Sequence, residues 1–448
     1  MTLKNFSLKI SKPIKNYNKL ISIDSDKSIS IRSFLISSIS EGISFVDNAL
    51  ESEDVKSTIE VVKRLGIKVK KIDNKKYQVY GKGLGSFKCK NHSFLNFGNS
   101  GTLARLIIGL LSTTPNIKVK IKGDKSLNKR NMGEIIKLMN QFGAEFLPKN
   151  KFYFPLTFYS SNYPIGISYN SGKSAQLKSA VILAGLNAYG KTLINENELS
   201  RDHTENILIR NKDSFKIIKK RGKKIIVNGK KALKCFSIKV PGDPSSAAFF
   251  VALTILKNNS KIKIKDVCLN PTRIGFYELL KKSGAKIKFK NLKRKNNEIV
   301  GDIVAESSNL KPIKATKDYY VKATDEYPIL FIISALTNGV SIYESLGGLK
   351  NKESDRVGEM RKILKQVGIK TEFKNNNVKI FGKQVLKKKD AIIKVPNLGD
   401  HRICMSSVIL SLVTGVEANI NNFETVNTSS PNFLNIIKFL GGKFEIKK

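Results

Sequence analysis

The chain has 448 residues, 41% of them hydrophobic, which is enough for about two or three domains with buried cores. It carries 80 Lys and Arg against 36 Asp and Glu, so its formal net charge at pH 7 is +44. The basic residues are spread along the chain and Trp is absent, a pattern that favours a general bias in composition over a dedicated nucleic-acid-binding tail. A surface this basic still attracts small anions.

The cysteines and histidines are scattered, which argues against a zinc site, a disulfide framework or another His-based metal site. They are Cys89, Cys235, Cys268, Cys404, His92, His203 and His401. Residues 1–20 contain no apolar segment typical of a signal peptide. The longest apolar runs, such as "PILFIISAL", are too short to span a bilayer. We therefore expect a cytoplasmic protein without a metal site and without a membrane or nucleic-acid partner.

Six segments share a polar start followed by an apolar stretch, and we expect each to form a helix that is buried on nearly all sides. They begin about 70–80 residues apart, which indicates an internal repeat. In chain order they cover residues 26–39, 101–111, 174–186, 243–256, 325–336 and 400–413. Amphipathic helices are predicted between them, at residues 51–66, 130–143, 270–284, 353–368 and 430–442. Alternating stretches such as "IKVKIKG" and "NNVKIFG" predict strands in the gaps.

Each repeat is thus interpreted as two helices with about four strands, an α/β (α+β) pattern. The repeats are expected to group three and three into two domains. Pro241 and Gly242 punctuate the chain near its midpoint. We expect one domain at residues 24–239 and a second formed by residues 1–23 and 240–448.

The polar starts are candidates for an anion site, because the N-terminus of a buried helix carries unpaired N–H groups and the positive end of the helix dipole. Cationic side chains at or near these starts are Lys27, Arg32, Arg105, Arg130, Lys352, Arg356 and Arg402. They come from both halves of the chain. This distribution predicts a ligand with more than one negative charge.

The stretch "GGLKNKESDRVGEM", residues 347–360, holds four charged residues within five positions, at Lys352, Glu353, Asp355 and Arg356. An apolar helical pattern follows it, so we expect these charges on the first turn of a helix. Taken alone, the stretch is typical of a solvated helix start. Similarly, "GNSGT" is compatible with a turn and cap, the basic run 216–231 with a solvated hairpin, and the acids at 325–326 with N-capping. Because these segments share one position in the repeat, we favour a functional role for them over these structural ones.

An ordered set of motifs resembles the EPSP synthase family, the 3-phosphoshikimate 1-carboxyvinyltransferases, over essentially the whole chain. The motifs are "DKSISIR", "GNSGTLAR", "GDKSLNKRNM", "SAQLKSA", "SRDHTE", "PGDPSSAAFF", "NPTR", "DEYP", "KESDR", "GDHR" and "TSSPNF". The resemblance implies a two-domain inside-out α/β barrel fold of six βαβαββ repeats, three per domain, with the active site in the interdomain cleft. It implies a cytoplasmic monomer of the shikimate pathway to aromatic amino acids, with no cofactor and no metal.

The implied reaction transfers the enolpyruvyl group of phosphoenolpyruvate to the 5-hydroxyl of 3-phosphoshikimate, releasing phosphate and 5-enolpyruvylshikimate 3-phosphate. The motifs assign catalysis to Asp325, Glu353 and Lys27. They assign 3-phosphoshikimate binding to Lys27, Ser28, Arg32, Ser174, Ala175, Gln176, Arg201, Asp325 and Lys352. They assign phosphoenolpyruvate binding to Lys27, Gly101, Arg130, Gln176, Arg356 and Arg402.

This addition–elimination reaction needs two acid/base groups, because the attacking hydroxyl loses a proton and C3 of the enolpyruvyl group gains one and later returns it. We assign Asp325 to the hydroxyl and Glu353 to C3, with Lys27 as the alternative proton donor. The cations orient the phosphate and carboxylate and stabilise developing charge. Asp355 is left to stabilise the helix N-terminus or orient a neighbouring cation.

The chain departs from the family pattern at Asp24 and Ser25, where Pro-Gly is usual, at Asn131 in place of proline, and at Thr428, where some members have lysine. Gly101 matches the glyphosate-sensitive subclass, whereas "SAQLK" and "RDHTE" resemble the tolerant one. The nearest alternative is an enolpyruvyl transferase acting on UDP-N-acetylglucosamine, which generally uses a loop cysteine absent from residues 110–132. A non-catalytic basic nucleic-acid-binding protein is disfavoured because no aromatic side chains interleave a basic patch.

Overall fold

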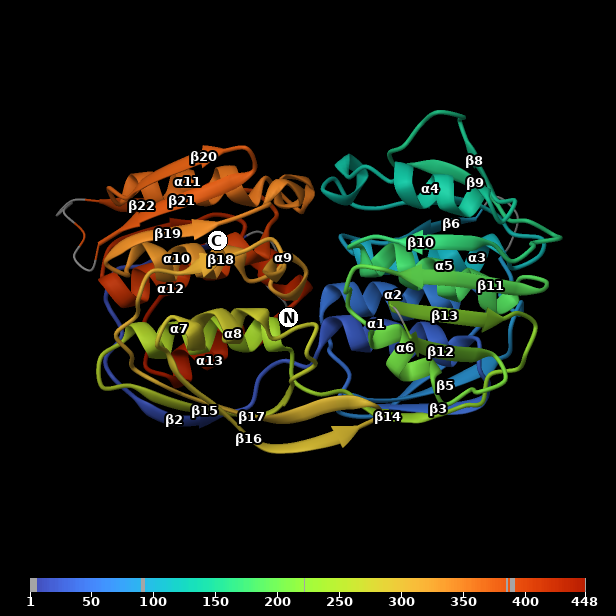
Figure 1. Cartoon of the computed structure of the whole chain (residues 1–448), viewed down its shortest axis with the longest axis horizontal. Helices are drawn as coiled ribbons and strands as arrows, with labels where there is room; N and C mark the ends of the chain where they lie inside the picture. Colours follow the sequence, from blue (N-terminus) through green and yellow to red (C-terminus); the bar gives the residue numbers. More distant parts are fainter. Residues whose placement is uncertain (1–5, 90–92, 221, 384–385, 387–390, 448) are drawn as a thin grey trace. The chain divides into compact units, whose positions relative to one another are not determined.

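The computed structural model describes residues 6–89, 93–220, 222–383, 386 and 391–447 (Figure 1). The chain forms two compact units. The first unit comprises Ser25–Val240 and Lys295–Glu298, and the second comprises Met1–Asp24, Pro241–Arg294 and Ile299–Lys448. The chain therefore changes units after Asp24 and after Val240, and the tip of one hairpin from the second half belongs to the first unit.

In the described residues the strands form six four-stranded sheets with one repeated pattern. In each sheet the first two strands in spatial order pair in parallel. The second strand pairs antiparallel with the third, and the fourth strand lies beside the third. The first unit holds β14 (Ser237–Lys239), β3 (Glu41–Asp47), β5 (Lys76–Lys82) and β4 (Lys68–Asp73); β6 (Phe94–Asn96), β7 (Lys118–Lys122), β9 (Leu156–Tyr159) and β8 (Glu145–Leu147); and β10 (Ser168–Ser171), β11 (Lys191–Glu196), β13 (Gly222–Asn228) and β12 (Phe215–Lys220).

The second unit repeats the pattern three times. Its sheets are β2 (Asn18–Ile21), β15 (Lys261–Cys268), β17 (Glu298–Glu306) and β16 (Lys286–Lys295); β18 (Lys314–Ala315), β19 (Gly339–Tyr343), β21 (Asn377–Gly382) and β20 (Lys370–Lys374); and β22 (Ile392–Val395), β23 (Glu417–Ile420), β1 (Ser7–Ile10) and β24 (Glu445–Lys447). This architecture confirms the predicted α/β repeat fold.

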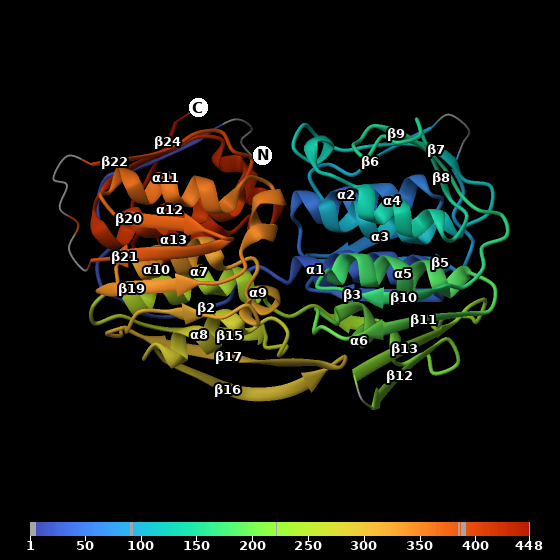
Figure 2. The same ribbon diagram turned by 45° about the horizontal axis from the view of Figure 1, so that its top comes forward.

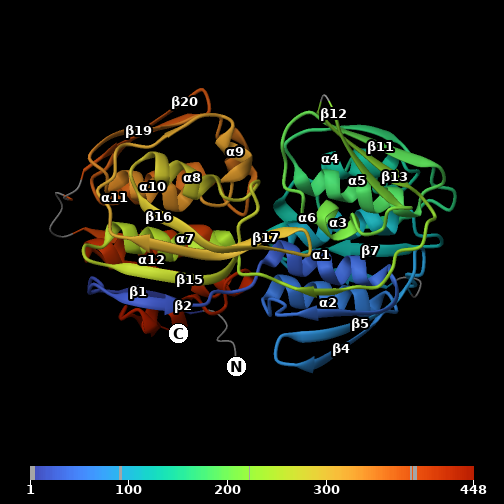
Figure 3. The same cartoon turned by 60° about the horizontal axis from the view of Figure 1, so that its bottom comes forward.

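Three sheets are completed by strands from distant parts of the sequence. β1 pairs antiparallel with β23 and β24, so the N-terminal segment closes the sheet of the last repeat. β2 pairs in parallel with β15, as Figure 3 shows for the blue strand, and β14 pairs in parallel with β3. The strand that precedes each change of unit along the chain therefore belongs to the sheet of the unit that the chain is leaving.

The six apolar helices lie inside the units, with the sheets outside them (Figure 2). They are α1 (Lys27–Ser38), α3 (Gly101–Ser112), α5 (Ala175–Asn187), α7 (Pro244–Leu256), α10 (Tyr327–Ala335) and α12 (His401–Thr414). α7 is buried continuously from Pro244 to Ile255, as expected for a helix that is apolar on all sides. α3 and α5 pack so closely that a Cβ atom at Gly109 would lie 2.5 Å from the Ala180 carbonyl oxygen.

The outer helices are shorter or amphipathic. They are α2 (Glu53–Arg64), α4 (Gly133–Asn140), α6 (His203–Leu208), α8 (Gly275–Lys282), α9 (Tyr319–Lys322), α11 (Arg356–Gln366) and α13 (Phe433–Phe439), with 3₁₀ turns η1 (Leu127–Lys129), η2 (Gly347–Asn351) and η3 (Phe423–Thr428). α2 has acids in its first turn and bases in its last, which complements the helix dipole. None of the helices in the described residues combines the length and the apolar composition needed to cross a membrane.

Candidate active site

In the first unit, Lys27 is the first residue of α1, directly after the N-cap Asp26. Its ammonium group lies 2.9 Å from Oδ2 of Asp54 on α2, and only 16% of the Lys27 side chain is exposed. The other Asp54 oxygen, Oδ1, is buried without a hydrogen-bond partner among the described residues. The carboxylate thus holds the lysine at the start of α1.

Arg32, five residues further along α1, is buried and donates hydrogen bonds to Thr204, Ser179 and Ser28 of the first unit. Its Nε donates to Thr204 Oγ1 at 2.8 Å, and its Nη2 donates to Ser179 Oγ at 3.3 Å. Its Nη1 donates to the carbonyl oxygen of Ser28 at 3.0 Å, one turn back on the same helix. This arrangement holds a cation in a defined orientation near the N-terminus of α1.

Two guanidinium groups lie at the start of α3. A Cβ atom at Gly101, the first residue of this helix, would lie 3.0 Å from Arg105 Nη1 and 3.1 Å from Arg130 Nη1. Arg130 also donates through Nη2 to Asn99 and, at 3.2 Å, to Ser126 Oγ. The glycine leaves room for the two cations beside the helix N-terminus, an arrangement suited to an anion.

The start of α5 lies beside that of α3. Ser174 is the N-cap of α5 and accepts from the Leu177 N–H, and Ala175 is the first helical residue. Gln176 Nε2 donates to Thr102 Oγ1 at 3.0 Å, which joins the two helix N-termini. Both termini therefore present polar groups in the same neighbourhood.

Arg201 lies half-buried in the loop between β11 and α6. Just before it, Ser200 donates through its backbone N–H and its hydroxyl to Glu196 Oε1, at 3.1 and 2.8 Å. The Glu196 oxygen also lies 2.5 Å from the ammonium group of Lys178, which is fully buried on α5. The loop that carries Arg201 is thus tied to α5.

A buried quartet of charges completes this region. Lys178 and Lys223 both pair with Glu196 and with Glu205, at distances of 2.5 to 3.2 Å. Burial alone would raise the pKa of Glu196, but the two lysines outweigh it and lower that pKa. Two positive and two negative charges compensate one another, which a buried cluster requires.

In the second unit, Arg356 is the centre of a carboxylate cluster. This arginine is 2% exposed, and its Nε donates to Asp400 Oδ2 at 3.0 Å. Its Nη2 donates to Glu353 Oε2 at 2.7 Å, and its Nη1 lies 3.5 Å from Asp325 Oδ1. Burial alone would lower the pKa of Arg356. The negative charges of Asp400, Glu353 and Asp325 outweigh this effect and raise the pKa above its ordinary value.

The start of the helix in the 347–360 stretch differs from the prediction. The helix α11 begins at Arg356, while Lys352 and Glu353 lie before it, after the 3₁₀ turn η2. Asp355 is the N-cap and accepts from the Gly358 N–H at 3.0 Å, which confirms its expected role at the helix N-terminus. A helical pattern cannot show where a helix begins, because the cap depends on the backbone turn that precedes it.

Arg402 lies near the start of α12 and is 4% exposed. Its guanidinium carbon lies 5.8 Å from the centre of the Phe249 ring on α7. Its Nε and Nη1 have no hydrogen-bond partner among the described residues. A buried guanidinium with unpaired donors is well suited to receive an anion.

Asp400 and Asp54 contact predicted site residues but were not predicted themselves. Asp400 is the fully buried N-cap of α12, and it accepts from the Arg402 N–H as well as from Arg356. Its place in "GDHR", directly before a buried helix, was a usable signal. Asp54 looked like an ordinary acid in the first turn of an amphipathic helix, and nothing local marked it.

The predicted residues therefore fall into two sets. The first unit holds Lys27, Ser28, Arg32, Gly101, Arg130, Ser174, Ala175, Gln176 and Arg201, and the second holds Asp325, Lys352, Glu353, Arg356 and Arg402. The first set gathers cations near the N-termini of buried helices. The second set places Arg356 at the start of the outer helix α11 and Arg402 near the start of the buried helix α12, and it brings both proposed acid/base carboxylates to Arg356.

The fold is shared with solved enolpyruvyl transferases. An EPSP synthase from Acinetobacter baumannii superposes with a TM-score of 0.84 at 32% identity, covering 99% of this chain and 100% of that one. The enolpyruvyl transferase NikO from Streptomyces tendae superposes with a TM-score of 0.74 at 12% identity, covering 99% of each chain.

Sequence relatives identify the family to which the chain belongs among the enolpyruvyl transferases. A family model described as EPSP synthase (3-phosphoshikimate 1-carboxyvinyltransferase) matches residues 11–437. The 3-phosphoshikimate 1-carboxyvinyltransferases of Zymomonas mobilis and Petrotoga mobilis are each 36% identical to the chain, over 430 and 434 residues. These matches cover 95% of this chain in both cases, and 94% and 98% of the relatives. The chain belongs to the EPSP synthase family, and the two alternative functions are not favoured.

Proposed function

We propose that the chain transfers the enolpyruvyl group of phosphoenolpyruvate to the 5-hydroxyl of 3-phosphoshikimate and releases phosphate. Membership of the EPSP synthase family supports the reaction and both substrates. The observation that carries the catalytic assignment is the buried Arg356, which holds Glu353 and Asp325 at two ends of one guanidinium group.

The first unit supplies most of the proposed contacts to 3-phosphoshikimate. The residues proposed for it are Lys27, Ser28, Arg32, Ser174, Ala175, Gln176 and Arg201, with Asp325 and Lys352 from the second unit. The fixed guanidinium of Arg32 and the capped start of α5 support this assignment, because both offer donors to a phosphate.

Phosphoenolpyruvate carries a phosphate and a carboxylate, and we assign it to Lys27, Gly101, Arg130, Gln176, Arg356 and Arg402. The guanidinium pair beside Gly101 and the unpaired donors of buried Arg402 support binding of an anion. Arginine suits both groups, since its planar fork pairs with two oxygens at once. The cations also stabilise the phosphate as it leaves.

Two proton transfers are assigned to carboxylates of the second unit. Asp325 takes the proton of the 5-hydroxyl as that oxygen attacks C2, and Glu353 delivers a proton to C3 and removes it in the elimination. Lys27 is the alternative donor to C3. Because Arg356 contacts both carboxylates, it keeps them within reach of one substrate pair.

Phosphate release from the two substrates in the presence of EDTA tests the reaction and its independence of metal together. Replacing 3-phosphoshikimate by UDP-N-acetylglucosamine tests the nearest alternative. Phosphate release with UDP-N-acetylglucosamine but not with 3-phosphoshikimate would overturn the proposal. Salt-dependent nucleic-acid binding without turnover of phosphoenolpyruvate would overturn it as well. A cytoplasmic location and a monomeric state stay predictions, which fractionation and sedimentation test.

A further inference from the structure

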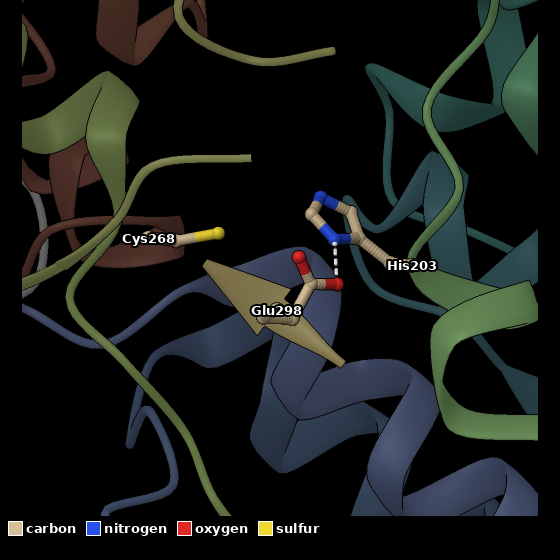
Figure 4. A group of neighbouring side chains, drawn as sticks. All are labelled: His203, Cys268 and Glu298. Carbon is tan, nitrogen blue, oxygen red and sulfur yellow. Dashed lines mark hydrogen bonds and ion pairs between the residues drawn. The ribbon is translucent and has the colours of Figure 1, made fainter. Parts of the chain in front are cut away.

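The short helix α6 is fixed in the first unit by its first three side chains. His203 Nδ1 lies 2.8 Å from Glu298 Oε1, at the hairpin tip that belongs to this unit (Figure 4). Glu205 pairs with Lys178 at 2.6 Å and belongs to the buried charge quartet. Thr204 lies between these two anchors and is fully buried. Its hydroxyl therefore has a defined position before any ligand binds.

The Thr204 hydroxyl can make its contact with Arg32 in only one direction. A guanidinium has no acceptor, so the hydroxyl accepts the proton of Arg32 Nε at 2.8 Å. Its own proton then goes to Ser179 Oγ, also at 2.8 Å. Ser179 Oγ accepts from Arg32 Nη2 as well, at 3.3 Å. The two hydroxyls together hold the Nε and Nη2 side of the fork.

These contacts determine the plane in which the guanidinium lies. The hydrogen bond from Arg32 Nη1 to the Ser28 carbonyl joins two residues of α1, so it does not fix the guanidinium relative to other elements. The contacts with Thr204 and Ser179 come from α6 and α5, so they position the guanidinium against the rest of the unit. A planar group recognises an anion through two N–H bonds only when its plane is correct.

We propose that Thr204, supported by Ser179, is a positioning residue that orients Arg32 for 3-phosphoshikimate. This inference rests on the proposed function. Thr204 belongs to the "SRDHTE" motif, from which the resemblance assigned only Arg201. Nothing in the sequence around Thr204 connects it to Arg32, because 172 positions separate the two residues.

Steady-state kinetics and calorimetric binding of 3-phosphoshikimate test the role of the hydroxyl. Thr204→Val keeps the shape and removes the hydroxyl, and we expect the KM and Kd for 3-phosphoshikimate to rise about tenfold. The kcat and the KM for phosphoenolpyruvate should stay within about twofold, because the reacting groups are untouched. Thr204→Ser restores the hydroxyl and should restore both constants. Thr192→Val is the matched control, since Thr192 is equally buried and its hydroxyl has no partner among the described residues.

A double-mutant cycle separates positioning from a general structural effect. Arg32→Lys removes the planar fork, so adding Thr204→Val to it should change the Kd for 3-phosphoshikimate by less than about twofold. The inference would be overturned if Arg32→Lys and Thr204→Val raised the Kd for 3-phosphoshikimate additively. It would also be overturned if Thr204→Val and Thr192→Val raised that Kd equally. If Thr204→Val does not fold, Ser179→Ala must raise the Kd for 3-phosphoshikimate several-fold. An unchanged Kd in Ser179→Ala would then overturn the inference. A wild-type chain that neither binds 3-phosphoshikimate nor releases phosphate would instead overturn the proposed function and, with it, this inference.

Discussion

Glu353 and Arg356 form a short ion pair, with Glu353 Oε2 2.7 Å from Arg356 Nη2. Arg356 is the first residue of α11, and Glu353 lies three residues before it. The arginine is buried, whereas 17% of the glutamate side chain is exposed. The pair therefore joins a group fixed in the protein to a carboxylate that a ligand can approach. This relationship underlies the division of roles proposed above, in which Arg356 binds and Glu353 transfers a proton.

Glu353→Gln should lower kcat by at least about 100-fold, because the amide can still accept from Arg356 but cannot exchange a proton with C3. Phosphate release at saturating substrate measures this, and thermal unfolding shows that the variant is folded. Asp355→Asn is the matched control in the same segment, since asparagine also caps a helix. Near-normal turnover of Glu353→Gln would move the role at C3 to Lys27.

Asp325→Asn should also lower kcat by at least about 100-fold, because the 5-hydroxyl then loses its base. Asp325 Oδ1 lies 3.5 Å from Nη1 of the buried Arg356, so thermal unfolding of the variant is measured beside its turnover. Single-turnover phosphate release separates the chemical step from substrate binding. A variant with a raised KM and an unchanged kcat would limit Asp325 to binding 3-phosphoshikimate.

Asp400→Asn should raise the KM for phosphoenolpyruvate about tenfold or more. The buried carboxylate contacts Arg356 Nε and accepts from the Arg402 N–H, so it orients one proposed ligand-binding arginine and caps the helix that carries the other. Removing its charge leaves Arg356 less well compensated in a buried site. The KM for 3-phosphoshikimate should change much less, and equal changes in both constants would argue for a general loss of structure.

Gly101→Ala should weaken phosphoenolpyruvate binding several-fold. The added Cβ would lie 3.0 Å from Arg105 Nη1 and 3.1 Å from Arg130 Nη1, so both guanidinium groups must move by a few tenths of an ångström. Glyphosate inhibition should weaken too if the same cations hold it. Gly172→Ala is the control, because a Cβ there meets no atom within 4 Å. An unchanged KM for phosphoenolpyruvate would contradict the assignment of Arg130.

Lys178→Met should reduce the free energy of unfolding at pH 7 by about 3–5 kcal/mol, since it leaves two buried carboxylates with one lysine. Lys173→Met, which breaks an exposed pair with Glu198, should cost below about 1 kcal/mol. Urea unfolding of both variants measures the difference.

The pH dependence of this effect has a definite sign. The lowered pKa of Glu196 in the wild type adds stability above the unfolded-state pKa of about 4.3, and this stability is lost as the pH falls through the folded-state value. In Lys178→Met one carboxylate relieves the imbalance by taking up a proton, so the deficit should shrink between pH 7 and pH 4. A deficit that grows toward acid pH would contradict the proposed charge balance.

Local patterns in the sequence were sufficient to predict the six apolar helices, five of which begin after a polar residue that caps the helix. Asp26, Ser100, Ser174, Asp243 and Asp400 each accept a backbone N–H within three residues, and such capping depends only on neighbours in the chain. The roles of the motif residues came from resemblance to a family. Neither source of information identified Thr204 and Asp54, which hold Arg32 and Lys27 in place.

The tertiary structure decided which distant groups meet. Arg32 binds Thr204 across 172 positions, Arg356 binds Asp400 across 44, and β1 pairs with strands at the other end of the chain. These partners are ordinary polar residues in sequence, and only the packing of helices and sheets brings them together. The sequence by itself thus determined the buried helices and the charged groups at their starts, while the fold determined how those groups are oriented, because orientation depends on contacts between residues that are remote along the chain.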